Sequence, residues 1–140
     1  MGRAVMMPLN EDVVRLAKAS NLATIVTLNP DGQPQAQLRW IDTDGEHLLV
    51  NTEPQRQAAQ NVERDPRVTI LIHSGESAYD WAEVRGRVVD SVTGDEARRH
   101  IDTLAHKYTG ADYAMPVGPQ GRVLWRVKAE REVTPATASR

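Results

Sequence analysis

Apolar and polar positions along this chain follow short patterns that predict strands joined by tight turns. Residues 22–28 (LATIVTL) form a continuous β-branched run, which is typical of a buried strand. Residues 33–41 (QPQAQLRWI) alternate instead, and this period of two predicts an amphipathic strand whose polar members face solvent. The NPDG segment between the two runs has the residues that a hairpin turn requires, so the two strands are expected to be antiparallel.

Four more strands and three helices are predicted along the rest of the chain. The strands lie at residues 47–52, 67–73, 80–92 and 122–133, and the helices at residues 10–19, 54–64 and 93–110. Gly86, in the middle of a strand pattern, predicts a bulge or a close approach of another backbone. Since tight turns join the early strands and the helices are too few for a doubly wound sheet, the pattern indicates a mainly β fold. We expect a six-stranded antiparallel barrel with peripheral helices.

Length, composition and charge restrict the class of protein. The 140 residues suit one domain, 1–140, in which residues 1–9 and 134–140 are expected to be flexible. A net charge of −2 and 4% aromatic residues argue against nucleic-acid binding. No apolar run approaches the roughly 20 residues of a membrane span, and no cysteine is present. These features favour a cytoplasmic protein.

The usual catalytic and metal-binding motifs are absent from the sequence. The four histidines form no HxxxH or HExxH pair, so no metal site is predicted. No GxSxG, GxGxxG or Walker motif occurs, and no side chain is predicted to act as a covalent catalyst. Trp40 is the tryptophan most suited to contact a ligand ring. Tyr108 and Tyr113 flank an irregular loop, which either borders a pocket or packs on the barrel.

One segment, NTEPQRQAAQNVERDPRV, passes from a strand end into a helix and raises the question of anion binding. Thr52 and Gln55 fit a capping box, and Pro54 suits a first helical turn. Arg56 lies near the free amides of that turn, where the helix dipole favours an anion. From these residues alone, a capped helix with a solvated arginine and a phosphate site are equally good interpretations.

The order of these segments resembles that of the pyridoxamine 5′-phosphate oxidase-like split barrels. The matching pieces are LATIVTLNPDGQPQAQLRW, the strand that ends in NT, NVERDPRV, VRGRVV, and KYTG before the last strand. Among the subgroups, the chain is most similar to short actinobacterial oxidoreductases that use the deazaflavin coenzyme F-420.

The resemblance implies a homodimer with two cofactor sites at its interface and hydride transfer to or from a small conjugated substrate. The flavin-type ring would lie against the second strand, and the phosphate over the third strand's end and the following helix. The cofactor-binding residues implied are Gln37, Leu38, Arg39, Trp40, Asn51, Thr52, Arg56, Gln57 and Asn61. The cofactor itself would supply the hydride chemistry.

The chain departs from the family pattern in the phosphate-binding helix. Members usually carry a lysine at the position of Ala58, and those that bind FMN often have an arginine at the position of Gln57. The family's basic residues on the second strand correspond here to Gln37 and Asp42. FMN depends most on these charges, whereas F-420 has a longer polar tail that can spread its contacts. Three functions therefore follow from the resemblance: an F-420-dependent oxidoreductase, an FMN-dependent oxidase or flavin reductase, and a non-catalytic barrel that binds flavin, haem or another hydrophobic ligand.

Overall fold

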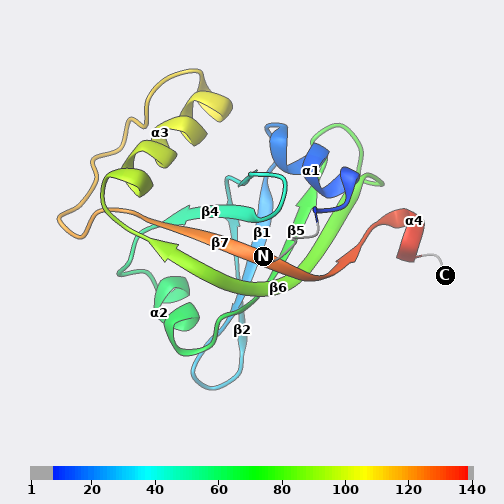
Figure 1. The fold of residues 1–140 in the computed structure, drawn as a ribbon, viewed down its shortest axis with the longest axis horizontal. Coiled ribbons are helices and arrows are strands. Elements are labelled where there is room, and N and C mark those ends of the chain that lie inside the picture. Colours follow the sequence, from blue (N-terminus) through cyan, green and yellow to red (C-terminus); the bar gives the residue numbers. More distant parts are fainter. Residues whose placement is uncertain (1–7, 139–140) are drawn as a thin grey trace, which may run out of the picture.

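Seven strands make up one antiparallel sheet in the computed structural model, which describes residues 8–138 (Figure 1). Their order across the sheet is β2-β1-β5-β6-β7-β4-β3. The strands are β1 Ala23–Leu28, β2 Pro34–Arg39, β3 Asp42–Thr43, β4 Leu48–Thr52, β5 Arg67–His73, β6 Trp81–Val92 and β7 Val123–Val133. The predicted mainly β, antiparallel fold is confirmed. It has seven strands in place of six because Asp42–Thr43 pairs with the start of β4.

The sheet curls into a split barrel because its two edge strands are consecutive in the chain. β2 ends at Arg39 and β3 begins at Asp42, so only Trp40 and Ile41 connect opposite edges of the sheet. Three peptide steps reach at most about 11 Å, so the two edges must lie close together. A short covalent link, rather than a strand pairing, therefore holds the barrel's seam.

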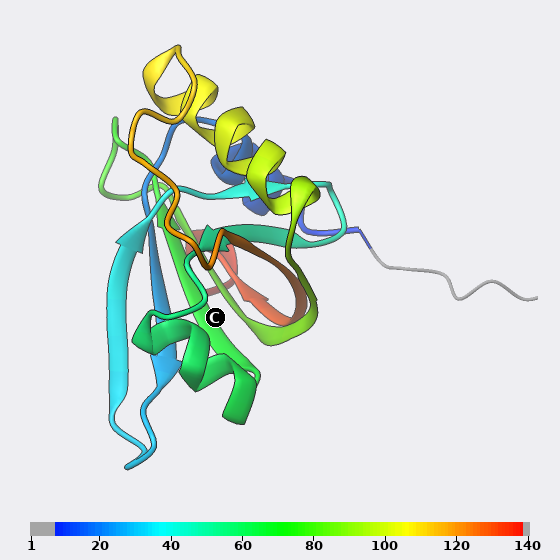
Figure 2. The ribbon, with the colours of Figure 1, turned by 90° about the vertical axis from the view of Figure 1, so that its left-hand side faces the viewer.

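Four helices lie around this barrel: α1 Glu11–Lys18, α2 Gln57–Arg64, α3 Asp95–Thr109 and α4 Pro135–Ala138. α1 and α2 contribute Leu16 and Val62 to the main core. α3 lies outside the sheet, along β4 and β7, where Ala97 packs on Leu124 (Figures 1 and 2). Because β4 has the barrel interior on one face and α3 on the other, all five of its residues are buried.

Two local signals in the sequence are confirmed by the backbone. Asn10 caps α1, and its side chain accepts a hydrogen bond from the Asp12 amide at 2.8 Å. Gly86 lies at the bulge between β6 and β7, where an added Cβ would fall 2.1 Å from the Lys128 carbonyl oxygen. The β7 backbone therefore occupies the space that any larger residue at position 86 needs.

The predicted orientation of β2 is wrong. Gln37 pairs with Ile25 and Arg39 pairs with Ala23, and both β1 partners are buried inside the barrel. Directly opposed residues of neighbouring strands point to the same face, so the polar side of β2 faces inward. Leu38 is 60% exposed on the outer face. The period of two separates the two faces of a strand but does not say which one is covered.

The chain ends differ in part from the expected flexible segments. Residues 1–7 and 139–140 lie outside the described residues. Leu9 is buried, and its amide donates to the Gly45 carbonyl at 2.9 Å. Residues 135–138 form α4 where the sequence predicts an irregular tail. Within residues 8–138, no helix has the length and apolar character needed to cross a membrane.

Candidate functional site

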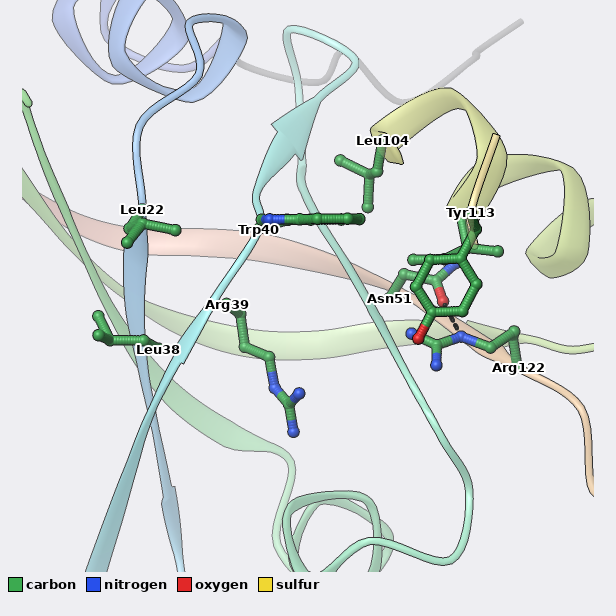
Figure 3. A pocket seen from close by; sticks show the side chains of 9 residues that line it. Leu22, Leu38, Arg39, Trp40, Asn51, Leu104, Tyr113 and Arg122 are labelled. Atoms are coloured by element: carbon green, nitrogen blue, oxygen red, sulfur yellow. Dashed lines mark hydrogen bonds between the residues drawn. The ribbon is translucent and has the colours of Figure 1, made fainter. Parts of the chain in front are cut away.

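A cavity of about 240 Å³ opens where β2, β4, α3 and the loop before β7 meet (Figure 3). Its apolar wall comes from β2, from α3 and from Leu22 just before β1, and two arginines reach it from opposite sides. Concave, mostly apolar sites with a few polar groups are where small ligands bind. The lining residues are Leu22, Leu38, Arg39, Trp40, Asn51, Ile101, Leu104, Tyr113 and Arg122. Four of the predicted cofactor-binding residues, Leu38, Arg39, Trp40 and Asn51, are therefore brought together here.

Trp40 forms one wall of the cavity, and two tyrosines fix its position. Its ring stacks on Tyr108 with a centroid distance of 5.1 Å and an interplanar angle of 6°, and it meets Tyr113 edge-on at 6.2 Å. The Tyr108 hydroxyl accepts from the Ile41 amide at 3.0 Å and donates to the Asn21 carbonyl. Because Ile41 directly follows Trp40, these bonds hold the indole at the barrel seam. A rigid aromatic wall of this kind suits a flat ligand.

The neighbouring Lys107 secures the same seam from α3. Its ammonium group donates to the Ala17 carbonyl at 2.7 Å and to the Ile41 carbonyl. Burial lowers the pKa of Lys107 to about 8. The KYTG segment therefore fastens the end of α3 to the end of α1 and to the link between β2 and β3. This fastening places KYTG beside the cavity.

Arg39 enters the cavity from the inward face of β2 (Figure 3). Its guanidinium donates to the Gln37 side chain at 2.6 Å. Burial is the main cause that lowers the pKa of Arg39, and the positive charges of Arg56 and Arg122 lower it further. Three arginines from separate parts of the chain therefore form one electrostatic cluster.

Arg56 contributes to this cluster from the start of α2, but not through the predicted capping box. The helix begins at Gln57, and Arg56 occupies the cap position with no side-chain cap bond. Gln55 donates to the Glu53 carboxylate at 2.8 Å instead of capping the helix, and Arg56 donates to Glu53 at 2.7 and 3.1 Å. The capping box fails because residues 53–56 form a turn of their own, closed by a 3.1 Å bond from the Arg56 amide to the Glu53 carbonyl.

Thr52 lies at the end of β4, directly before that turn. Its side chain is 1% exposed, and its hydroxyl has no hydrogen-bond partner among the described residues. Buried hydroxyls are normally hydrogen-bonded, because leaving one unpaired costs free energy. Thr52 does not line the cavity, but its unpaired hydroxyl lies just before the turn that leads to Arg56 and the uncapped start of α2, where an anion's oxygen atoms are favoured.

Asn51 connects the cavity to α3 and to the start of β7. Its amide nitrogen donates to the Ala97 carbonyl at 2.9 Å and lies 3.1 Å from His100 Nδ1, and its oxygen accepts from Arg122 Nε at 2.8 Å. Burial lowers the pKa of His100, so its ring favours the neutral form. Asn51 is 5% exposed and Arg122 is 7% exposed, so the guanidinium of Arg122 is held in a fixed direction at the cavity.

The remaining predicted residues lie on or within α2. Asn61 is fully buried, and its amide nitrogen donates to Thr27 at 3.0 Å and to Asn29 at 2.9 Å. Gln57 donates to Asn61 at 2.9 Å. Ala58 is 7% exposed and packs in the main core, so this position supplies no charge to the cavity. None of these three residues lines the cavity.

Sequence reasoning did not identify Arg122 and His100 as parts of the site. Arg122 follows Gly121 and precedes an apolar strand, and an arginine between a turn glycine and apolar strand residues was the available signal. Of the two interpretations of the loop after α3, the one in which it borders a pocket is confirmed, because Tyr113 lines the cavity. Within residues 8–138, no group of three or more His, Asp or Glu side chains is placed to hold a metal ion.

Comparisons with known proteins agree with this fold. The sequence model of the family described as pyridoxamine 5′-phosphate oxidase matches residues 9–134. A structure described as an F420 reductase is 27% identical, with a TM-score of 0.79 over 89% of this chain and 98% of that one. A conserved hypothetical protein from Mycobacterium tuberculosis is 22% identical, with a TM-score of 0.68 over 100% of this chain and 94% of that one, and shows the same fold. No curated protein sequence matches the chain.

Proposed function

The chain belongs to the pyridoxamine 5′-phosphate oxidase family, a flavin-type oxidoreductase family, and on that premise we propose that it is an oxidoreductase dependent on the deazaflavin coenzyme F-420. The observation that carries the proposal is the two-sided cavity, which joins an aromatic wall at Trp40 to a cluster of arginines. The similarity to an F420 reductase over 89% of the chain supports the choice of cofactor. A flat ring with an anionic tail has the chemistry that such a cavity accepts.

The proposed binding mode assigns a separate task to each end of the cavity. Gln37, Leu38, Arg39 and Trp40 would lie along the ring, and Trp40 would limit access of water to one of its edges. Thr52, Arg56 and Gln57 would bind the cofactor's anionic tail. Bound F-420 would supply the hydride chemistry. The protein's part would be to position the ring and to balance its charge, since no covalent catalyst is proposed.

The residues present fit F-420 better than FMN. The unpaired Thr52 hydroxyl and the arginine cluster provide donors for an anion. Ala58 and Gln57, however, leave α2 without the lysine and arginine that FMN-binding relatives commonly place there. One charge-assisted hydrogen bond is worth about 1.5–3 kcal/mol. Losing it lowers the binding affinity of a compact phosphate ligand by about a factor of ten or more. A longer polar tail can recover this loss through additional contacts.

The outer face of the sheet supports the proposed homodimer. Leu38 is 60% exposed on β2 and Leu71 is 37% exposed on β5, with β1 between these strands. Apolar side chains gathered on one exposed sheet face are typical of an interaction surface. Because Leu38 also lines the cavity, a second copy on this face would lie next to the cofactor.

The decisive experiment titrates the purified protein with F-420 and with FMN, and then mixes it with reduced F-420 and a panel of conjugated acceptors. We expect F-420 to bind at micromolar concentration and acceptor reduction to follow the loss of reduced F-420. Failure to bind F-420 at tens of micromolar would refute the proposal, and tight FMN binding would favour the FMN-dependent alternative. Binding without turnover of any acceptor would favour the non-catalytic barrel.

A further inference from the structure

Arg122 is a nearly buried cation for which the fold alone gives no reason. It directly precedes β7, is 7% exposed and lines the cavity opposite β2 (Figure 3). Asn51 accepts from its Nε at 2.8 Å, and its guanidinium carbon lies 5.2 Å from the centre of the Tyr113 ring. These contacts fix both the direction and the plane of the guanidinium. A side chain held in this way is prepared for a ligand rather than free to move in solvent.

The charges around Arg122 are not balanced. The charge of Arg56 acts on both Arg39 and Arg122, and the carboxylate of Glu53 acts on both in the opposite sense. Three positive charges and one negative charge leave a surplus of two. Glu53 is already bound by Arg56 through two hydrogen bonds, and it forms an ion pair with Arg122 at 3.7 Å that is too long for a hydrogen bond, so two arginines share this one carboxylate.

This surplus has a physical cost that a ligand can remove. Burial is the main cause that lowers the pKa of both Arg39 and Arg122, and the mutual repulsion of the arginines adds to it. Buried charges require a partner, because desolvation is otherwise not compensated. A group with two negative charges would balance the cluster. Planar guanidinium groups bind the oxygens of phosphate in pairs, which makes phosphate the matching chemistry.

We propose that Arg122, held by Asn51, is a phosphate-binding residue of the cavity and acts together with Arg39. It supplies from β7 the positive charge that α2 lacks at Ala58. The proposal deepens the proposed function and rests on it for the identity of the ligand. The phosphate belongs either to the cofactor or to a substrate that binds beside it, and both sources present the same chemistry to the arginines.

The test measures ligand binding, not turnover, in the wild type and in R122M, R122K and R126Q. Arg126 is a matched control because it lies on β7, four residues after Arg122, but pairs with Asp90 and Glu96. FMN and riboflavin form the ligand pair, since they differ only in the phosphate. We expect R122M to lower the affinity for FMN by about 10–100-fold and the affinity for riboflavin by less than about twofold. R122K should keep part of the FMN affinity, and R126Q all of it.

A second measurement does not depend on any flavin. Inorganic phosphate should raise the thermal midpoint of the wild type and of R126Q, but not that of R122M. If phosphate competes with F-420, the cofactor is the source of the phosphate. If phosphate binds equally well to the F-420-saturated protein and still requires Arg122, the source is a substrate. Either result supports the proposal.

Two results would overturn the proposal. One is an R122M protein that binds FMN and inorganic phosphate as the wild type does. The other is an equal loss of affinity for FMN and for riboflavin in both R122M and R122K. That result would indicate a purely structural role for Arg122. These outcomes are independent of the proposed function: phosphate binding through Arg122 without hydride transfer refutes only the oxidoreductase. Turnover that is insensitive to Arg122 refutes only the present proposal.

Discussion

Two buried asparagines occupy similar positions in the sequence but very different places in the molecule. Asn61 on α2 is fully buried, accepts from Gln57 at 2.9 Å, and donates to Thr27 at 3.0 Å and to Asn29 at 2.9 Å. Asn61 also accepts from Arg64 Nη1 at 3.4 Å, and Arg64 does not line the cavity. The network begins on α2 and ends in β1 and its turn, so its effect is to attach the helix to the barrel.

Asn51 uses the same amide chemistry but belongs to a network that ends at the cavity. Its nitrogen donates to the Ala97 carbonyl, and its oxygen accepts from Arg122, whose guanidinium lines the cavity. A buried asparagine therefore becomes part of a site when its hydrogen bonds lead to a charged group that lines a cavity, as Arg122 does and Arg64 does not. The two networks should therefore respond differently to the same substitution.

The largest effect on folding is expected for Asn61→Ala. This change leaves Thr27, Asn29 and Gln57 without their shared partner in a buried position. We expect the free energy of unfolding to fall by about 2–4 kcal/mol, measured by urea denaturation. Gln57, which is proposed to bind the cofactor's tail, keeps its own side chain in this variant, so the FMN or F-420 affinity of the folded protein should stay within about twofold. A loss of affinity as great as that in an Asn51 variant would show that the Asn61 network also serves the site.

Asn51→Ala should give the opposite balance of effects. Arg122 loses the acceptor that fixes its Nε, so its guanidinium no longer has a preferred direction at the cavity. We expect affinity for a phosphate-bearing ligand to fall by about 5–30-fold, while the free energy of unfolding falls by only about 1–2 kcal/mol. Fluorescence titration with FMN and with riboflavin measures the effect. An equal loss for both ligands would contradict the assignment of Asn51 to the positioning of Arg122.

The pH dependence of stability separates the two networks further, because the Asn51 network contains a histidine and the Asn61 network does not. Burial lowers the pKa of His100 below its ordinary 6.5. Between the folded and unfolded pKa values, the unfolded state binds a proton that the folded state does not, so stability decreases as pH falls below about 6.5. The slope reaches at most about 1.4 kcal/mol per pH unit.

Protonation of His100 also acts on the hydrogen bonds of Asn51. His100 Nδ1, 3.1 Å from the Asn51 amide nitrogen, accepts a hydrogen bond only while it carries no proton. We therefore expect acid to weaken FMN or F-420 binding in the wild type, and to do so less in His100→Leu. Urea denaturation and titration between about pH 5 and 8 test this, with Asn61→Ala as the control whose slope matches the wild type. A wild-type slope retained in His100→Leu would contradict the assignment.

Much of the fold follows from the sequence because local signals agree with one another. The hairpin turn, the Asn10 cap and the bulge at Gly86 each depend on a few neighbouring residues, and all three are found as predicted or expected. The orientation of β2 could not be predicted, since which face of a strand is covered depends on what packs there. The exposed Leu38 shows that hydrophobicity alone does not decide this.

The candidate site was only partly predictable for a related reason. Three of the predicted residues lie at or near recognisable strand ends, and the cavity brings together Arg39, Trp40 and Asn51. Arg122 precedes β7 and His100 lies on α3, and long-range packing alone brings them to Asn51. The capping box at Thr52 was wrong because the turn at Glu53 delays the helix, and a sequence pattern does not show where such a turn closes.

The smallest expected effect is a gain in ligand affinity, which only the charged cluster around Arg122 can produce. Glu53→Gln removes the carboxylate from the arginine cluster and raises its surplus charge from two to three, while a glutamine oxygen can still accept from Arg56. We expect FMN or F-420 affinity to rise by about fivefold at low salt, which corresponds to about 1 kcal/mol. Asp65→Asn is the matched control. Asp65 forms an ion pair with Arg67 at 2.7 Å, and neither residue lines the cavity. The gain should shrink at high ionic strength, since it arises from charge and not from packing. An unchanged or reduced affinity in Glu53→Gln would mean that the cluster is already balanced, and the Asn51 network would then be as self-contained as that of Asn61.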